Sequence, residues 1–162
     1  MIRKATPEDA QAICDIYNYY VLDTIVTFEE DIVLADDMAE RIKKVSEKYT
    51  WLVHEQEGEI IGYAYAGEWK SRCSYRFSVE SSVYLKNGFS GHGIGSKLYT
   101  ALFKELEKTD IHAVIGGVSL PNDGSIALHE KFGFEKIAQF KEVGYKFEKW
   151  IDVGYWEKII SR

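Results

Sequence analysis

The chain has 162 residues, of which 46% are hydrophobic, and its 20 basic and 26 acidic side chains give a formal net charge of -6. This length suits one domain with a single core, and the apolar content is too high for a disordered chain. An acidic chain binds nucleic acid weakly, because affinity for nucleic acid depends on lysine and arginine side chains that neutralise its phosphates. A small phosphorylated ligand needs only a few local hydrogen-bond donors, so the net charge does not exclude it.

No apolar run has the length of a signal peptide or of a membrane-spanning helix, so we expect a cytoplasmic protein without membrane partners. Cys14 and Cys73 are too few for a disulfide framework or a zinc site. We expect free thiols, with Cys14 packed in a helix and Cys73 in a loop; a nucleophilic Cys73 is the alternative, but no base for it is evident. The histidines show no metal-ligand spacing, so no metal is expected.

The amino terminus predicts a short strand over 2–5 and then a helix, which Thr6 can cap and Pro7 and Asp9 suit as first-turn residues. Further along the chain, the apolar spacing predicts a helix over 36–49, strands over 51–57, 60–69 and 76–85, a helix over 96–108, a strand over 113–118, a helix over 123–132, and at least two strands within 134–160. This order is typical of an α+β sandwich on a mixed, mostly antiparallel sheet, with a βαβ unit near its middle. We expect one domain over 1–162.

Residues 87–95 form a glycine-rich turn between a strand and a helix, where backbone N–H groups and the helix dipole favour an anion. Neither common nucleotide motif fits. A Walker A loop needs lysine after its second glycine, but Ile94 follows Gly93, and a dinucleotide fingerprint counted from Gly91 has Ser96 at its sixth place. From Lys86 to Lys104 there are three lysines and no acid, which favours a diphosphate. A tight turn without a ligand is the alternative.

Several motifs occur together in the order of a known family. The core motifs are Val79-Glu80-Ser81-Ser82-Val83-Tyr84-Leu85, Gly91-x-Gly93-x-Gly95, Asn122-Asp123-x-Ser125 and Leu128-His129-Glu130-Lys131-Phe132-Gly133-Phe134. They resemble the acetyl-CoA core of the GNAT superfamily of N-acetyltransferases. Others are similar to its phosphinothricin and methionine sulfoximine acetyltransferase branch: Ile16-Tyr17-Asn18-Tyr19-Tyr20-Val21, Thr27-Phe28-Glu29, Trp69-Lys70-x-Arg72 and Val143-Gly144-Tyr145-Lys146-(x3)-Trp150-x-Asp152-Val153-Gly154-Tyr155-Trp156.

The resemblance covers nearly the whole chain. It implies a GNAT fold of about seven strands and about four helices, acetyl-CoA as co-substrate, a homodimer, and the antibiotic and herbicide resistance associated with this branch. Acetyl transfer to an amine requires a base, a polarised carbonyl and a proton for the departing thiolate, and it needs no metal.

Glu80 is the candidate general base. It interrupts an apolar strand, and strict alternation puts it on one face with Ser78, Ser82 and Tyr84. It lies shortly before the glycine turn, near where a thioester held there would end, and the resemblance implies the same role. We expect burial to raise the pKa of Glu80. A carboxylate facing solvent is the alternative.

The resemblance also implies the residues that bind acetyl-CoA. Pantetheine would bind backbone groups of Val83, Tyr84 and Leu85, with the Leu85 N–H as the oxyanion donor. The remaining candidates are Ser90, Gly91, His92, Gly93, Ile94, Gly95 and Ser96 for the diphosphate, and Asn122 and Ser125 for the pantetheine arm. Ser90 departs from the Gln or Arg usual at its place, a loss that closer backbone approach at Gly91 could offset. For Asn122 a helix cap is an equal alternative.

The proton donor is assigned less directly. His129 stands where many relatives have a tyrosine and could donate or relay a proton. A packed, hydrogen-bonded His129 is the alternative.

The substrate candidates flank Glu80 in the sequence or belong to the loop between the first two helices. They are Phe28, Glu29, Trp69, Arg72, Tyr75 and Arg76. Arginine forks can anchor a carboxylate and aromatic rings can form walls, which fits a small amino acid analogue of the phosphinothricin, methionine sulfoximine or methionine sulfone type. The alternatives are another amine, such as a protein N-terminus or a polyamine, and a non-catalytic acyl-CoA sensor.

Overall fold

A computed structural model describes residues 1–160; residues 161 and 162 of the expected domain lie outside the described residues. The elements follow in the order β1 (Ile2–Lys4), α1 (Ala10–Asp23), α2 (Ala35–Ser46), β2 (Trp51–Gln56), β3 (Glu59–Glu68), β4 (Ser78–Leu85), α3 (Ile94–Leu106), β5 (Ala113–Ser119), α4 (Asp123–Lys131), β6 (Glu135–Lys146) and β7 (Lys149–Ile159). Short 3-10 turns cover Pro7–Asp9 and Cys73–Tyr75. The α+β class with seven strands and four helices is confirmed.

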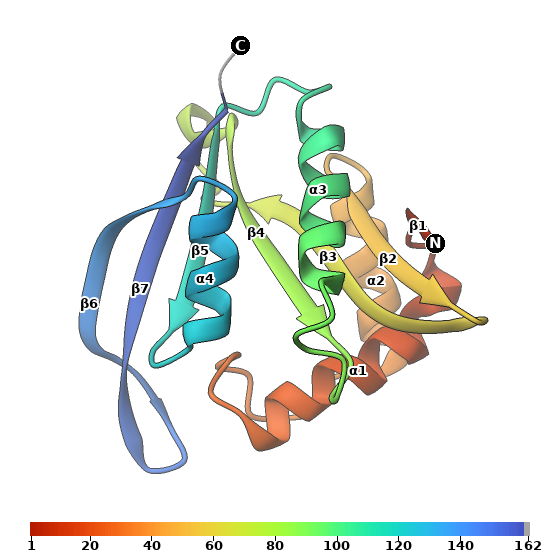
Figure 1. Cartoon of the computed structure of the whole chain (residues 1–162), viewed down its shortest axis with the longest axis horizontal. Helices are drawn as coiled ribbons and strands as arrows, with labels where there is room; N and C mark the ends of the chain where they lie inside the picture. Colours follow the sequence, from red (N-terminus) through yellow and green to blue (C-terminus); the bar gives the residue numbers. More distant parts are fainter. Residues whose placement is uncertain (161–162) are drawn as a thin grey trace.

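All seven strands form one sheet, in the order β1-β2-β3-β4-β5-β7-β6. Every pairing is antiparallel except that of β4 with β5. The helices α3 and α4 cover one face of the sheet, and α1 and α2 cover the other (Figure 1). None of the helices described between residues 1 and 160 is long and apolar enough to cross a membrane.

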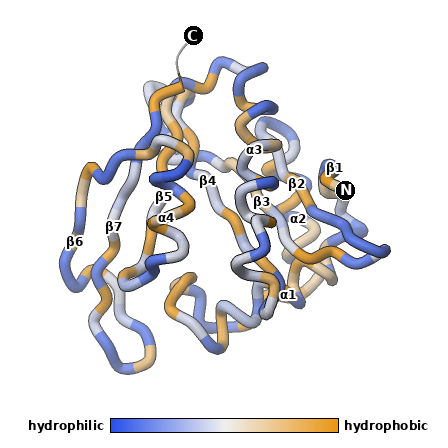
Figure 2. The backbone as a smooth tube through the Cα atoms, in the orientation of Figure 1, coloured by the Kyte–Doolittle hydropathy of each residue, from blue (hydrophilic) through white to orange (hydrophobic). Residues whose placement is uncertain are grey.

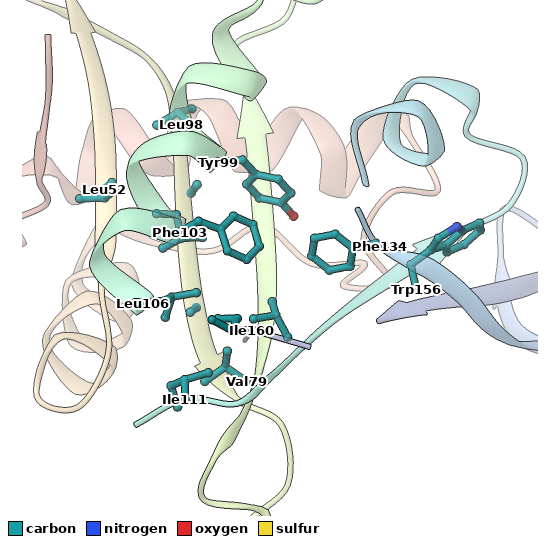
Figure 3. Packing of buried hydrophobic residues seen from close by; sticks show 14 of the residues in the cluster. Leu52, Val79, Leu98, Tyr99, Phe103, Leu106, Ile111, Phe134, Trp156 and Ile160 are labelled. Atoms are coloured by element: carbon teal, nitrogen blue, oxygen red, sulfur yellow. The ribbon is translucent and has the colours of Figure 1, made fainter. Parts of the chain in front are cut away.

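Each face of the sheet has its own hydrophobic core. One core packs α3 against the sheet through residues that include Leu98, Tyr99, Leu102 and Trp156 (Figure 3). The other packs α1 and α2 through residues that include Ile13, Ile42, Trp51 and Tyr63. Hydrophobic stretches run along α1 and the central strands, whereas the turn after α3 is hydrophilic (Figure 2). Two opposed cores fix β4, which lies between them.

The parallel pair β4 and β5 separates early. The two strands pair only over Ser78–Glu80 of β4, although β4 continues to Leu85. Figure 1 shows them side by side at the top and diverging downward, so that the gap between them opens toward the loop that follows α1. On its other side β4 stays paired with β3 in one register to Leu85. The middle of the sheet therefore contains a gap with one well-supported edge.

Three predicted elements have ends that are wrong by a few residues. The strand predicted over 76–85 begins at Ser78, because the preceding 3-10 turn leaves Arg76 in a helical conformation. The helix predicted over 96–108 begins at Ile94, because Gly93 caps it with φ at 75°, and it ends at Leu106. The helix predicted over 36–49 ends at Ser46. These shifts leave the order of the elements unchanged.

Candidate functional site

One groove gathers most of the predicted acetyl-CoA residues. It has a volume of about 510 Å³ and is lined by Tyr20, Val26, Val83, Leu85, Ser90, Gly91, Gly93, Ile94, Gly95, Ser96, Asn122, Gly124, Ser125, Ala127, Leu128 and Lys131. The groove therefore extends from the start of α3 and the side of α4, across the gap between β4 and β5, to α1 and its following loop. Of the predicted set, Tyr84 and His92 do not line it.

The glycine turn at the start of α3 needs its glycines for their backbone conformation. Gly91 and Gly93 have φ of 81° and 75°, and no other atom lies within 4 Å of where a Cβ would be. A larger residue at either position would be disfavoured by backbone strain at positive φ and not by crowding. The space beside this backbone is therefore open to a ligand. A cation that sequence reasoning missed lies beside the turn: Lys131 of α4 donates to Ser96 Oγ at 3.0 Å.

The backbone of β4 alternates between its two sides. Lys86 N–H donates to the Ile61 carbonyl, so in the register of this antiparallel ladder Tyr84 forms the next hydrogen-bonded pair, with Tyr63 of β3. The polar backbone groups of Val83 and Leu85 then point away from β3, into the gap. The Leu85 carbonyl accepts a hydrogen bond from Tyr20 Oη at 2.5 Å. Val83 and Leu85 are thus brought to the gap, and the backbone of Tyr84 is not.

Two polar side chains of the α4 region are engaged inside the protein. The Asn122 side chain accepts from the N–H of Ser125 at 3.1 Å and caps α4, and it also lines the groove. His129 is 3% exposed. Its Nε2 lies 3.2 Å from Tyr99 Oη and its Nδ1 lies 2.7 Å from the Ser125 carbonyl. The carbonyl can only accept, so Nδ1 carries the proton and Nε2 accepts from Tyr99. Burial lowers the pKa of His129, which favours this neutral form.

Glu80 lies on the opposite face of β4 from Val79, which belongs to the α3 core, in agreement with the predicted alternation. The Glu80 carboxylate makes no hydrogen bond or ion pair with any residue between 1 and 160, and burial raises its pKa. The pKa of Tyr155 is raised mainly by the burial of its ring and, to a smaller extent, by the negative charge of Glu80. A half-buried carboxylate without a partner is poised to accept a proton from a ligand.

An aromatic wall stands beside Glu80. A Cβ built on Gly117 would lie 3.5 Å from Glu80 Oε1 and 3.2 Å from the Tyr155 ring, so the carboxylate and this ring are near neighbours. Trp69 packs edge-on against Tyr155, with 5.8 Å between ring centroids. Sequence analysis gave Tyr155 no role at the site. The only available signal for it was its place in the family-like tail motif.

The other substrate candidates are dispersed. Arg72 and Tyr75 line a shallow pocket of about 440 Å³. Arg76 instead stacks on Phe77 and donates to the Cys73 carbonyl. Phe28 packs on Gly144 of β6.

The carboxylate of Glu29 is already paired within the protein. It accepts two hydrogen bonds from Arg41, at 2.6 and 2.9 Å, and a third from Tyr17. The Arg41 guanidinium holds the pKa of Glu29 below its usual value.

Cys14 is buried and Cys73 exposed, and both are free thiols, as predicted. Between residues 1 and 160, no three side chains among histidine, cysteine, aspartate and glutamate gather as a metal site would require.

Glu80 should lower the stability of the fold when it is ionised. Its pKa is higher folded than unfolded, so this group favours folding most below its usual pKa of about 4.3 and loses that contribution as pH rises through the raised value. We expect Glu80→Gln to raise Tm at about pH 8, with the gain shrinking toward about pH 4. Thermal unfolding across this range measures it. A lower Tm for Glu80→Gln at about pH 8 would contradict the assigned environment.

Comparison with known proteins agrees with this geometry. The family described as "Acetyltransferase (GNAT) domain" matches residues 2–154. A phosphinothricin N-acetyltransferase of Streptomyces viridochromogenes is 39% identical over 97% of this chain and 86% of its own. An L-methionine sulfoximine/L-methionine sulfone acetyltransferase of Salmonella typhimurium is 36% identical over 95% and 91%.

A solved structure has the same architecture. The phosphinothricin acetyltransferase of Sinorhizobium meliloti, in complex with AcCoA, superposes with a TM-score of 0.96 at 32% identity, covering 99% of this chain and 88% of its own. The groove, the glycine turn, the isolated Glu80 and these likenesses agree, and the chain belongs to the GNAT acetyltransferase family as an acyltransferase.

Proposed function

We propose that the protein transfers the acetyl group of acetyl-CoA to the α-amine of a small amino acid whose side chain carries a tetrahedral polar group. Phosphinothricin, methionine sulfoximine and methionine sulfone are the representative substrates, since relatives named for them match nearly the full chain. The observation that carries the proposal is the partnerless Glu80, with its raised pKa, on the strand that borders an anion-binding groove.

The groove fits acetyl-CoA as co-substrate. The diphosphate would lie against the turn from Ser90 to Ser96, where open backbone at Gly91 and Gly93 and the amino terminus of α3 supply donors. Lys131 adds a positive charge at the same place. The pantetheine arm would pass the Asn122 side of the groove and follow the free edge of β4 at Val83 and Leu85.

The chemistry would be direct attack of the amine on the thioester: a C–N bond would form, the C–S bond would break, and the departing CoA thiolate would take up the proton that Glu80 has accepted from the amine, directly or through a water. When bound, acetyl-CoA supplies an acyl group activated as a thioester. Glu80 accepts the proton of the amine, directly or through a water, and its raised pKa makes it a stronger base than an exposed carboxylate. The Leu85 N–H donates to the carbonyl oxygen as negative charge develops there. Most of the rate comes from holding the two reactants together.

His129 is a poor candidate for the proton donor to the thiolate. Both ring nitrogens already have partners in Tyr99 and Ser125, and a His of lowered pKa carries no spare proton near neutral pH. These contacts favour the structural role that the sequence left open.

The amine would approach from the α1 face, where the Glu80 side chain points. Trp69 and Tyr155 form an aromatic wall there, and Phe28 belongs to the loop after α1. Arg72 and Tyr75, which line the nearby shallow pocket, are our candidates for holding the substrate carboxylate.

The test is a thiol-release assay with acetyl-CoA against phosphinothricin, methionine sulfoximine, methionine sulfone, polyamines and N-terminal peptides. We expect Glu80→Gln to lower kcat by roughly 10²- to 10⁴-fold while acetyl-CoA affinity stays near that of the wild type. Glu68→Gln, an exposed carboxylate on β3, is the control and should keep wild-type kcat.

Other outcomes separate the alternatives. Thiol release with peptides or polyamines, and none with the amino acids, would show that the substrate is another amine. A thermal shift with acetyl-CoA and no turnover of any amine would support a sensor. A near-normal kcat for Glu80→Gln would remove Glu80 from the base role.

We propose in addition that the protein forms a homodimer through the tip of the β6–β7 hairpin. Val143, Tyr145, Phe147 and Trp150 are all exposed there, Trp150 by 65%. The rings of Tyr145 and Trp150 contact each other at 4.7 Å between centroids. A group of exposed apolar side chains of this kind is typical of a protein interface.

Light scattering after gel filtration tests the dimer. We expect the wild type at twice the 18.6 kDa chain mass and Trp150→Glu at the monomer mass, because a buried carboxylate would oppose association. Ile159→Glu, exposed at the far end of β7, should remain dimeric. A monomeric wild type at micromolar concentration would contradict the proposal.

A further inference from the structure

Lys146, at the end of β6, is the most deeply buried charged side chain between residues 1 and 160. It is 1% exposed, and burial lowers its pKa. Its Nζ donates to two backbone carbonyls, those of Thr27 at 2.8 Å and Tyr20 at 3.3 Å. Glu30 acts on it only through space. Burying an ammonium group in this way is costly unless its hydrogen bonds stabilise a particular arrangement.

Both carbonyls belong to the segment that forms the amine side of the site. Tyr20 lies in the last turn of α1, and Thr27 lies in the loop over 24–34 that joins α1 to α2. The same loop carries Phe28, and it contributes Val26 to the acetyl-CoA groove. Lys146 therefore holds this loop from the side of the β6–β7 hairpin.

A second contact joins the same two segments. On β6 the buried Gly144 and Lys146 alternate with the exposed Val143 and Tyr145, so the two pairs point to opposite sides of the strand. The Phe147 ring, in the following turn, lies on the Lys146 side, with its centroid 5.1 Å from Nζ. A Cβ on Gly144 would lie 2.3 Å from the ring of Phe28, so only glycine permits this approach. Gly144 and Lys146, the two buried residues at the end of β6, therefore both contact the loop.

Tyr20 extends the connection to the reaction centre. Its carbonyl accepts from Lys146, and its Oη donates to the Leu85 carbonyl at the open edge of β4. The N–H of Leu85 is the oxyanion candidate. One residue therefore separates the buried ammonium group from the strand end where the acetyl carbonyl would lie.

We infer that Lys146 is a positioning residue for acyl transfer, which holds the α1–α2 loop in place as a wall of the amine site. This inference rests on the proposed function. Methionine matches the length of lysine but cannot donate, so Lys146→Met leaves the Thr27 carbonyl without its charged donor. Lys149, exposed in the same hairpin, provides a matched control that makes none of these contacts.

For Lys146→Met we expect the KM for the amine to rise by about 10-fold or more, because charge-assisted hydrogen bonds are lost. The dissociation constant for acetyl-CoA should change less than the KM for the amine, since the glycine turn is untouched and the tethered segment lines only one end of the groove, through Tyr20 and Val26. Hydrogen exchange should accelerate over residues 24–34 and stay at the wild-type rate in β7. Lys149→Met should match the wild type in all three measurements.

Two results would overturn the inference. One is a wild-type KM for the amine together with wild-type exchange over residues 24–34. The other is faster exchange spread evenly through β6 and β7, which would make Lys146 a general stabiliser of the hairpin. If Lys146→Met does not fold, Lys146→Gln, which keeps N–H donors on a shorter side chain, serves in the same measurements with the same criteria. Hydrogen exchange needs no substrate. If the wild type were inactive on every amine, the proposed function would be refuted, but the exchange rates would still test whether Lys146 holds the loop over residues 24–34.

Discussion

The architecture depends on one interruption of hydrogen bonding, the separation of β4 from β5 after Glu80. A continuous sheet would satisfy the backbone groups of Val83 and Leu85 and close the passage between its faces. Because the strands diverge, the groove that begins at the glycine turn, on the α3 face, reaches Tyr20 and Val26 on the α1 face. Under the proposed function, the two reactants would meet at this gap in the sheet. The unbroken pairing of β4 with β3 and a core on each side keep this free edge rigid.

The same interruption explains the chemistry of Glu80. The carboxylate lies on the last residue of β4 that pairs with β5 and is close to the Tyr155 ring, without a cation to stabilise its charge. This environment is unfavourable for folding at neutral pH but suits proton transfer, a trade-off expected at active sites. By contrast, three other charged or titratable side chains considered for the site have partners elsewhere in the fold: Glu29 with Arg41, His129 with Tyr99 and Ser125, and Lys146 with two carbonyls. Glu80 differs from these side chains because its carboxylate has no hydrogen-bond or ion-pair partner among the described residues.

Local sequence signals predicted the elements and the glycine turn well, since both depend on spacing and on residues near one another in the chain. Alternation alone placed Glu80 on the correct face of its strand. It could not say which backbone groups of β4 pair with β3, so Tyr84 was grouped with Val83 and Leu85. Lys131, Tyr155 and Lys146 gain their roles from partners distant in sequence, and no local pattern marks such contacts. The pairing of Glu29 with Arg41 was missed for the same reason.

The central claim is that the free edge of β4 receives the acetyl-CoA arm. Amide hydrogen exchange resolved by residue, with and without acetyl-CoA, tests it most directly. We predict that binding slows exchange at Val83 and Leu85, whose N–H groups point into the gap, and leaves Tyr84, already paired with β3, nearly unchanged. Unchanged exchange at Val83 and Leu85 under saturating acetyl-CoA would contradict the account.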